Sequence, residues 1–245
     1  MSQLPTIGMI VPPADGAVPP EPPALYSDRA RFLACGLALE RLSAEGYDAV
    51  IGHVADLART LKTRGARVVS LMGTSLSFYR GPEFNAALIE TMQEATGLPA
   101  STMTTAVVDA LNIVGARRLA VATAYRDDVN RRLADYLEWA GFEILSLRAL
   151  DIADVETIQA VGSDDLVRLG REAFDAASSA DALFISCGGL RTMPVTPVLE
   201  EACGVPVVSS AMAGAWGAMR LAGLDARAPK AGRLFEIDCG AALVS

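Results

Sequence analysis

The stretch ALFISCGGL, residues 182–190, decides the fold class because it joins a short apolar run directly to a pair of glycines. A run of this length, bounded by turn residues, is typical of a buried strand in a parallel sheet. Cys187 would then lie at the carboxyl end of the strand, where backbone N–H groups of the turn converge. Reactive cysteines often occupy such positions, because neighbouring N–H groups alter the pKa of the thiol.

The same arrangement occurs earlier in the chain without the thiol. Residues 68–75 read VVSLMGTS, so that an apolar run leads into Gly73, Thr74 and Ser75. Hydroxyl and N–H groups at a strand-to-helix turn can bind a carboxylate and stabilise charge on its oxygens. The two stretches therefore predict an anion-binding turn in one half and a proton-carrying group in the other. The competing interpretation is a common structural turn at Gly73 and a small buried hydrophobic residue at Cys187.

Short apolar runs alternate with longer segments of helical spacing throughout the chain, which predicts βαβ units and a parallel sheet. The predicted strands cover residues 7–11, 68–72, 119–123, 182–186 and 205–208, and a further strand follows Pro99. The predicted helices cover residues 47–64, 84–96, 127–140 and 163–177.

An internal repeat underlies this alternation. Gly73 follows Pro12 by 61 residues, and Cys187 follows Tyr125 by 62. Each half also has a Gly-x-Pro entry to a strand, at 97–99 and 204–206.

We therefore predict an α/β fold of two pseudo-symmetric Rossmann-like subdomains, each a short parallel sheet flanked by helices. The active site would lie in the cleft between them, because ligands of open α/β sheets bind at the carboxyl ends of the strands. Residues 1–112 with 212–245 would form the first subdomain and residues 113–211 the second.

The charge and the apolar content of the chain indicate which classes of partner to expect. The chain of 245 residues has a formal net charge of −8 and a pI near 4.7, and it lacks a basic stripe, so nucleic acid is not an expected partner. It has no signal-peptide pattern and no run of about 20 apolar residues. We therefore expect no membrane partner and a cytoplasmic location. The expected assembly is a monomer, with an oligomer left open.

The cysteine, histidine and glycine motifs of the chain limit the kinds of catalytic and cofactor site that it can form. The four cysteines, of which Cys35, Cys203 and Cys239 are expected to be structural, lack the spacing of a disulfide framework or zinc site. The single histidine, His53, lies in a helical pattern, which disfavours a Ser/His/Asp triad, a Cys/His pair and a metal centre. No glycine motif for dinucleotides or nucleoside triphosphates is present. We expect no cofactor and no metal. The proline-rich stretch 12–23 is expected at the cleft rim, with an ordinary surface loop as the alternative.

Longer segments around these residues carry a family resemblance. They read IGMIVPP (7–13), EGYDAV (45–50), VVSLMGTSLSFYRG (68–81), ATAYRDDVN (122–130), SCGGL (186–190) and GVPVVSS (204–210). Over nearly the whole chain the sequence resembles the arylmalonate decarboxylase family of the aspartate/glutamate racemase superfamily. Racemases of the superfamily carry one cysteine in each half, whereas this chain has Gly73 at the first position and only Cys187 at the second. The resemblance therefore implies the decarboxylase branch rather than a two-base racemase.

The resemblance also implies residue roles. Cys187 would protonate an enediolate left by loss of carbon dioxide from a small dicarboxylate, an α-aryl or α-alkenyl malonate, giving one enantiomer of the monoacid without a cofactor. The implied carboxylate-binding residues, or dioxyanion hole, are Thr74, Ser75, Tyr125 and Gly188. A small hydrophobic pocket would be formed by Leu39, Leu42, Tyr47, Leu76, Val155 and Ile158. A larger pocket would be lined by Pro12, Pro13, Gly73 and Gly189. The alternatives are a racemase or maleate-type cis-trans isomerase of the same superfamily, and a noncatalytic binder of small carboxylates.

Overall fold

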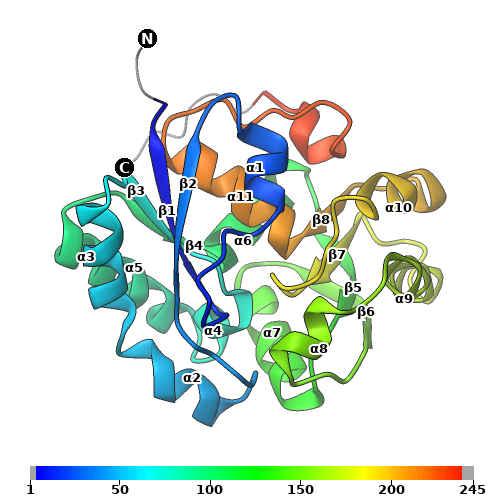
Figure 1. Ribbon diagram of the computed structural model, residues 1–245. Helices are drawn as coiled ribbons and strands as arrows, with labels where there is room; N and C mark the ends of the chain where they lie inside the picture. The colour runs from blue at the N-terminus through cyan, green and yellow to red at the C-terminus, as the bar shows by residue number, and fades with distance from the viewer. Residues whose placement is uncertain (1–3, 239–245) are drawn as a thin grey trace.

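Two parallel four-stranded sheets form the framework of the protein, for which the computed structural model describes residues 4–238 (Figure 1). The strand orders are β2-β1-β3-β4 and β6-β5-β7-β8, so the second sheet repeats the topology of the first. The first sheet consists of β1 (Thr6–Val11), β2 (Arg31–Gly36), β3 (Val68–Leu71) and β4 (Ala100–Thr102). The second consists of β5 (Arg118–Thr123), β6 (Glu143–Ala149), β7 (Ala182–Ser186) and β8 (Val207–Ser209). The predicted α/β fold of two similar parallel sheets is confirmed.

Helices flank both sheets (Figure 1). Those that follow strands of the first sheet are α1 (Glu21–Tyr26), α2 (Ala44–Ile51), α3 (Val54–Thr63), α4 (Thr74–Phe78), α5 (Pro82–Thr96) and α6 (Met103–Ile113). Those of the second half are α7 (Asp127–Trp139), α8 (Val155–Gln159), α9 (Ser163–Asp175), α10 (Thr196–Cys203) and α11 (Ser210–Leu221), followed by the 3₁₀ turn Arg233–Glu236. Both sheets lie within the residue ranges predicted for the two subdomains, and the division of the remaining chain between them stays a prediction.

Two features differ from the sequence-based expectation. The helix predicted over residues 47–64 is two helices, because α2 ends before Gly52 and α3 begins after His53. Glycine has low helix propensity, and the His53 amide bonds the Val50 carbonyl at 3.0 Å in a tighter turn. Strands β2 and β6 were not predicted. Both are edge strands with mostly half-buried or exposed side chains, so they lack the continuous apolar run of a central strand.

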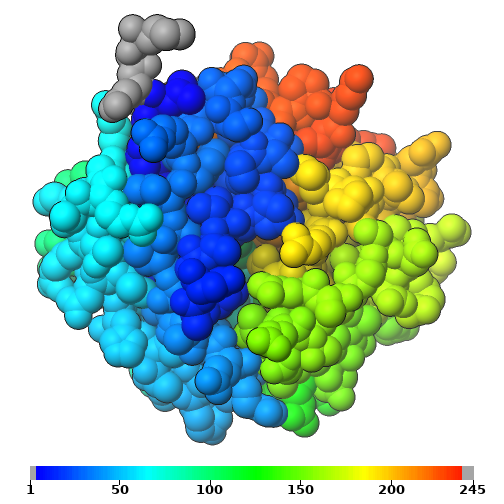
Figure 2. All heavy atoms as spheres, viewed as in Figure 1, coloured from blue at the N-terminus to red at the C-terminus, as the bar shows by residue number. Residues whose placement is uncertain are grey.

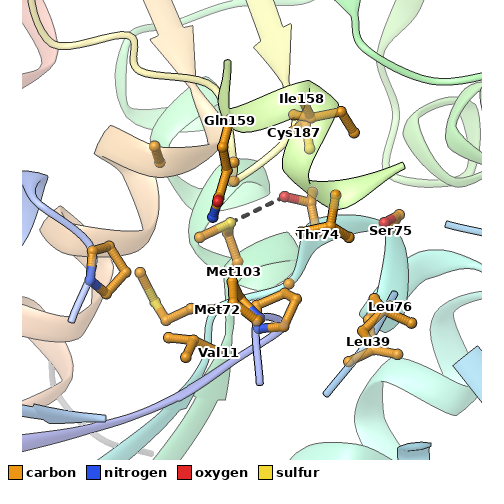
Figure 3. Close-up of a pocket in the computed structure, with 18 of the residues that line it drawn as sticks. Val11, Leu39, Met72, Thr74, Ser75, Leu76, Met103, Ile158, Gln159 and Cys187 are labelled. Atoms are coloured by element: carbon orange, nitrogen blue, oxygen red, sulfur yellow. Dashed lines mark hydrogen bonds between the residues drawn. The ribbon is translucent and has the colours of Figure 1, made fainter. Parts of the chain in front are cut away.

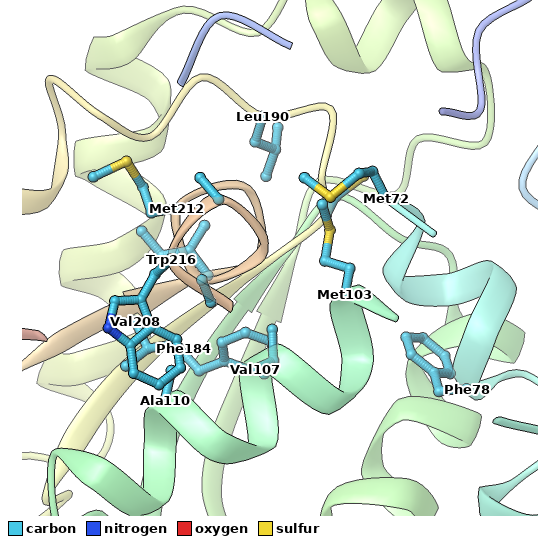
Figure 4. Close-up of a cluster of buried hydrophobic side chains, with 14 of the residues drawn as sticks. Met72, Phe78, Met103, Val107, Ala110, Phe184, Leu190, Val208, Met212 and Trp216 are labelled. Atoms are coloured by element: carbon cyan, nitrogen blue, oxygen red, sulfur yellow. The ribbon is translucent and has the colours of Figure 1, made fainter. Parts of the chain in front are cut away.

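Helices α6 and α11 pack against each other between the two sheets and carry the internal repeat into the core. Each begins directly after the fourth strand of its sheet, with the capping side chains of Thr102 and Ser209 accepting backbone N–H bonds. Gly217 permits the close approach, since a Cβ there would lie 2.5 Å from that of Ala106. Side chains of α6, α11, β7 and β8 meet in one apolar cluster that includes Trp216, buried to 1% exposure (Figure 4).

The proline-rich segment after β1 lies on the surface at the boundary between the two halves. Figure 2 shows this dark blue segment against the green and yellow segments of the second half. Residues 12–20 form a loop and the last part, from Glu21, begins helix α1 with prolines in its first turn. Across residues 4–238, no helix combines the length and apolarity required to span a membrane.

Candidate active site

A cavity of about 220 Å³ lies where the carboxyl ends of the strands in both halves face each other (Figure 3). It is lined by every residue that the sequence analysis placed in the site, with the exception of Tyr47. These residues are Pro12, Pro13, Leu39, Leu42, Gly73, Thr74, Ser75, Leu76, Tyr125, Val155, Ile158, Cys187, Gly188 and Gly189. Parallel strands bring these positions together because their carboxyl ends share one edge of each sheet.

The turn after β3 supplies hydroxyl and N–H donors. Gly73 has an extended backbone, with φ of −141°, and precedes helix α4, so the first N–H groups of that helix have no partner within it. Thr74 and Ser75 are 2% and 4% exposed. The Thr74 hydroxyl donates a hydrogen bond to the Met103 sulfur at 3.0 Å (Figure 3). Sulfur is a weak acceptor, so a carboxylate oxygen would be a better partner for this hydroxyl.

The base of this turn is fixed by buried hydroxyl groups. Ser77 donates to the carbonyl oxygens of Gly73 and Thr74 at 2.9 and 3.0 Å, and Thr104 donates to the Thr74 carbonyl at 2.9 Å. Ser77 and Thr104 also bond each other at 2.6 Å. All the participating side chains are buried. The donors of the turn are therefore held in place before any ligand binds, as electrostatic stabilisation of a developing charge requires.

The turn after β7 has a different geometry. Cys187 has φ of 151°, a backbone conformation that residues other than glycine rarely adopt. No helix follows, and the Cys187 carbonyl accepts a bond from the Leu190 N–H at 3.3 Å. Gly188 packs closely on Met103, since a Cβ there would lie 2.8 Å from the Met103 sulfur and would require that side chain to shift. Backbone strain of this kind is concentrated at functional sites.

The Cys187 thiol is held in its neutral form. Burial raises the pKa of the thiol to about 11. The Gly189 N–H and the Tyr125 hydroxyl would stabilise a thiolate, and they oppose this rise in pKa only in part. The side chain is 6% exposed and faces the cavity. At neutral pH the sulfur thus carries a proton that it can donate, and the two neighbouring donors are positioned to receive the charge left behind.

Tyr125 adds a hydroxyl from the second half. Burial raises its pKa well above the ordinary value, so the hydroxyl stays protonated, and Ser186 donates a hydrogen bond to it at 3.2 Å. The backbone of Tyr125 is fixed by Asn130, which donates to its carbonyl at 3.0 Å and accepts from Thr123 at 2.7 Å. The phenol therefore lies beside the thiol as a rigid donor.

Tyr47 is the one predicted pocket residue that lies behind the cavity wall, with its hydroxyl close to the Ser75 hydroxyl. It does not line the cavity, and its ring packs on Tyr79 with centroids 4.6 Å apart. Helix α2 directs this side chain behind the Ser75 turn, where it is 1% exposed. Its hydroxyl forms no hydrogen bond of normal geometry within the described residues, although the Ser75 hydroxyl is close enough to lower its pKa against the larger rise from burial. The sequence pattern around Tyr47 does not indicate whether its side chain faces the cavity or lies behind the residues that line it.

Several lining residues were not predicted. From the first half they are Val11, Asp15, Ala17, Val18, Pro19, Pro20, Glu21, Met72 and Met103, and from the second Gln159, Arg191 and Ala211. The expected position of the 12–23 stretch at the cleft rim is consistent with this set. Met72 and Met103 adjoin strand ends, and this position could have predicted that they line the cavity. No local sequence feature of Gln159 or Arg191 indicates that they do.

Within residues 4–238, no three His, Cys, Asp or Glu side chains lie together in a group able to hold a metal ion. Cys35, Cys187 and Cys203 are free thiols, and Cys239 lies outside the described residues. His53, expected on a helix or its flank, is an exposed residue at the start of α3, and the residues that line the cavity do not include it.

The sequence profile described as arylmalonate decarboxylase matches residues 7–235. The chain belongs to the arylmalonate decarboxylase family. The arylmalonate decarboxylase of Bordetella bronchiseptica is 54% identical over 236 residues, which cover 96% of this chain and 98% of that protein. The family and the enzyme class predicted from the sequence, a decarboxylase, are therefore confirmed.

Solved structures extend the comparison beyond the arylmalonate decarboxylase family. A double mutant of arylmalonate decarboxylase in the liganded form superposes with a TM-score of 0.92 at 54% identity, covering 95% of this chain and 99% of that one. A Nocardia farcinica maleate cis-trans isomerase mutant with a covalently bound succinylcysteine intermediate superposes with a TM-score of 0.90 at 25% identity, covering 96% and 100%. Arylmalonate decarboxylases and maleate isomerases therefore share this architecture.

Proposed function

We propose that the protein decarboxylates α-aryl or α-alkenyl malonates without a cofactor and gives one enantiomer of the monoacid through Cys187. The observation that carries the proposal is the neutral Cys187 thiol in the same cavity as the donors of Thr74, Ser75 and Tyr125. This set can hold one carboxylate and supply one proton. The similarity to the Bordetella arylmalonate decarboxylase supports the substrate class.

The carboxylate that remains in the product would be held by the donors around Thr74. Loss of carbon dioxide leaves an electron pair on the α carbon, and the barrier falls when that charge spreads into a carboxylate whose oxygens already accept hydrogen bonds. The hydroxyls of Thr74, Ser75 and Tyr125 and the N–H groups of Ser75, Cys187 and Gly188 are the donors for the resulting enediolate. The backbone of the turn after β3 needs no rearrangement, because the buried hydroxyls of Ser77 and Thr104 already fix its carbonyl groups.

The departing carboxylate would face the apolar wall. Leu39, Leu42, Leu76, Val155 and Ile158 line the cavity and offer no hydrogen bond from their side chains. A carboxylate against such a wall loses its hydration without gaining partners, which favours its conversion to neutral carbon dioxide. The bond between the α carbon and this carboxylate carbon breaks, and its electron pair enters the enediolate.

Protonation would come from one face. Cys187 transfers its proton to the α carbon, and the thiolate is stabilised by the Gly189 N–H and Tyr125 hydroxyl until it regains a proton from solvent. Gly73, at the matching position of the other half, has no proton to offer. A single donor on one side yields one enantiomer, whereas racemisation requires a donor on each face.

The maleate isomerase alternative has a specific observation against it. A covalent succinylcysteine, as bound in the Nocardia enzyme, requires a nucleophilic sulfur, and the active form of a cysteine nucleophile is the thiolate. Burial of Cys187 disfavours that form by raising its pKa to about 11, and the matching position of the other half, Gly73, has no sulfur. A one-sided proton donor agrees better with this thiol than a nucleophile does.

The test is a carbon dioxide assay with phenylmalonate and methylphenylmalonate in buffer containing a chelator, with product analysed by chiral chromatography. We expect carbon dioxide release unaffected by the chelator and one enantiomer of 2-phenylpropionate. In deuterium oxide the product should carry one deuterium at the α carbon. Conversion of maleate to fumarate without release of carbon dioxide from any malonate would overturn the proposal. Binding of phenylacetate with no turnover of any substrate would favour the noncatalytic alternative.

A further inference from the structure

The two ends of the cavity differ in polarity. At one end the walls are apolar side chains from α4, α8 and the segment after β2, including Leu39, Leu76 and Ile158. At the other end the cavity reaches helices α1 and α11, which pack against each other away from α4 and α8 (Figure 1). This second end is lined by Glu21 and Ala211, with Arg191 also among the lining residues. A substrate bound by the donors around Thr74 would extend its larger substituent toward this end.

Glu21 is a buried carboxylate in that wall. Its side chain is 4% exposed, and burial raises its pKa above the ordinary value. Within the described residues it forms no ion pair and no hydrogen bond with another residue; its contacts are with its own backbone N–H and, at longer range, the charge of Arg191. An ionised carboxylate in an apolar wall without a partner is unfavourable. A ligand group that donates a hydrogen bond to it would remove that cost.

A ligand hydroxyl or amine that donates to Glu21 favours its ionised form against the rise in pKa caused by burial, and the ionised form accepts hydrogen bonds and donates none. It therefore discriminates between substituents that differ little in size: a phenolic hydroxyl or an aromatic amine donates to it, an ether does not, and a second carboxylate is repelled. Arg191 opposes this repulsion only weakly, because its side chain is exposed to solvent and its charge is screened. The negative charge of the buried Glu21 therefore outweighs the screened positive charge of Arg191, and this end of the cavity favours a hydrogen-bond donor over an anion.

We propose that Glu21 determines substrate specificity by accepting a hydrogen bond from a hydroxyl or amino group on the aryl ring, so that hydroxyaryl or aminoaryl malonates are the preferred substrates. This inference rests on the proposed decarboxylation and names the substrate class of the same site. A site built to bond a substrate hydroxyl rejects the analogue without it more strongly than an apolar pocket rejects a change in size.

The experiment compares kcat/KM for phenylmalonate with that for its 3- and 4-hydroxy, 4-amino, 4-methoxy and 4-carboxy derivatives. We expect at least one hydroxy or amino derivative to exceed phenylmalonate by about tenfold or more, the size expected of a hydrogen bond to a charged group. The methoxy derivative should show no such gain, and the carboxy derivative should be the poorest. Glu21→Leu should abolish the ratio of hydroxy to unsubstituted substrate, and Glu21→Gln should reduce it.

Glu156→Gln is the matched control, because this exposed carboxylate on α8 lies near the cavity without lining it. Its substrate ratios should equal those of the parent protein. If Glu21 only supports the fold, its variants will lower kcat/KM for all substrates equally and leave the ratio unchanged, which overturns the inference. A preference for the carboxy derivative also overturns it, since Arg191 would then dominate this end of the cavity.

A binding measurement separates the two proposals. Calorimetry of Cys187→Ala with 4-hydroxyphenylacetate, 3-hydroxyphenylacetate and phenylacetate reports the contact with Glu21 without requiring turnover. Tighter binding of a hydroxy compound that is lost in the Glu21→Leu double variant supports the inference even if no malonate is decarboxylated. Equal binding of all three compounds overturns it even if phenylmalonate is a good substrate.

Discussion

The turns after β3 and β7 occupy the same place in two sheets of identical strand order, yet they differ in backbone and in chemistry. The first passes through the extended Gly73 into a helix, which leaves N–H groups and hydroxyls facing the cavity. The second holds Cys187 at φ of 151° and continues as a turn without a helix. In the proposed reaction, the first copy of the repeat would receive negative charge and the second would donate a proton, so that a symmetric framework would support a reaction on one face of the substrate.

Removal of the proton-carrying group should have the largest effect. Cys187→Ala leaves the carboxylate donors in place and eliminates the general acid, so we expect kcat to fall by about 10³-fold or more. Phenylacetate binding, measured by calorimetry, should change little. Cys203→Ala is the control, because this second free thiol lies at the end of α10, away from the cavity. Turnover within tenfold of the parent protein would mean that the proton comes from another group.

Removal of a charge-binding group should have the next largest effect. Thr74→Val preserves the shape of the side chain and deletes its donor, and loss of one such donor costs about 10²-fold to 10³-fold in kcat. Thr96→Val is a matched control, since Thr96 is equally buried at 2% exposure and bonds a carbonyl far from the cavity. Steady-state kinetics of both variants decide the point. If Thr74→Val raises only KM, Thr74 binds the substrate without stabilising the transition state.

The contact between the two turns should have a smaller effect. Met103 accepts the Thr74 hydrogen bond and packs against Gly188. Met103→Leu keeps a similar volume and removes the acceptor, so we expect a several-fold gain in kcat/KM, because the Thr74 hydroxyl has one proton and no longer gives up a hydrogen bond to sulfur when it donates to the substrate. Met92→Leu, at another buried methionine, is the control. If Met103 acts through Thr74, the substitution will have no further effect in Thr74→Val, whereas equal losses in both backgrounds would indicate packing alone.

Sequence reasoning found the repeat because its central strands are buried on both faces and leave continuous apolar runs. It failed for β2 and β6, whose partly exposed side chains carry no such signal. In the site, residues adjoining strand ends, such as Thr74 and Cys187, were predictable from topology. Arg191 was not, because its place on the cavity wall depends on how the chain after Gly189 packs. For Glu21 the sequence predicted only the rim position of the 12–23 stretch, and the burial of its side chain depends on how α1 packs.

Two properties of Cys187 could not be predicted from any sequence motif. The strained backbone of Cys187 and the direction of its pKa shift follow from burial and from the turn that the fold imposes. Tyr47 shows the converse, because its motif matched the family while its ring packs behind the Ser75 turn. Position along the chain was therefore more predictable than the orientation of side chains.

The pH dependence of the rate should be the smallest effect within the accessible range, and its sign distinguishes the two roles of the thiol. Burial raises the pKa of Cys187 to about 11, and a proton donor is active only below its pKa. We therefore expect kcat/KM, which reports the free enzyme, to be level from pH 7 to 9 and to fall toward half its value near pH 11. Tyr125 does not interfere, since burial keeps it protonated over this range. The stability of the fold should fall over the same interval, because a pKa raised above that of the unfolded thiol, about 8.5, stabilises the folded state only at lower pH. Circular dichroism at each pH separates loss of structure from loss of the proton. A rate that rises with pH would identify the thiolate as the active form, and the turn after β7 would then carry a nucleophile instead of a proton.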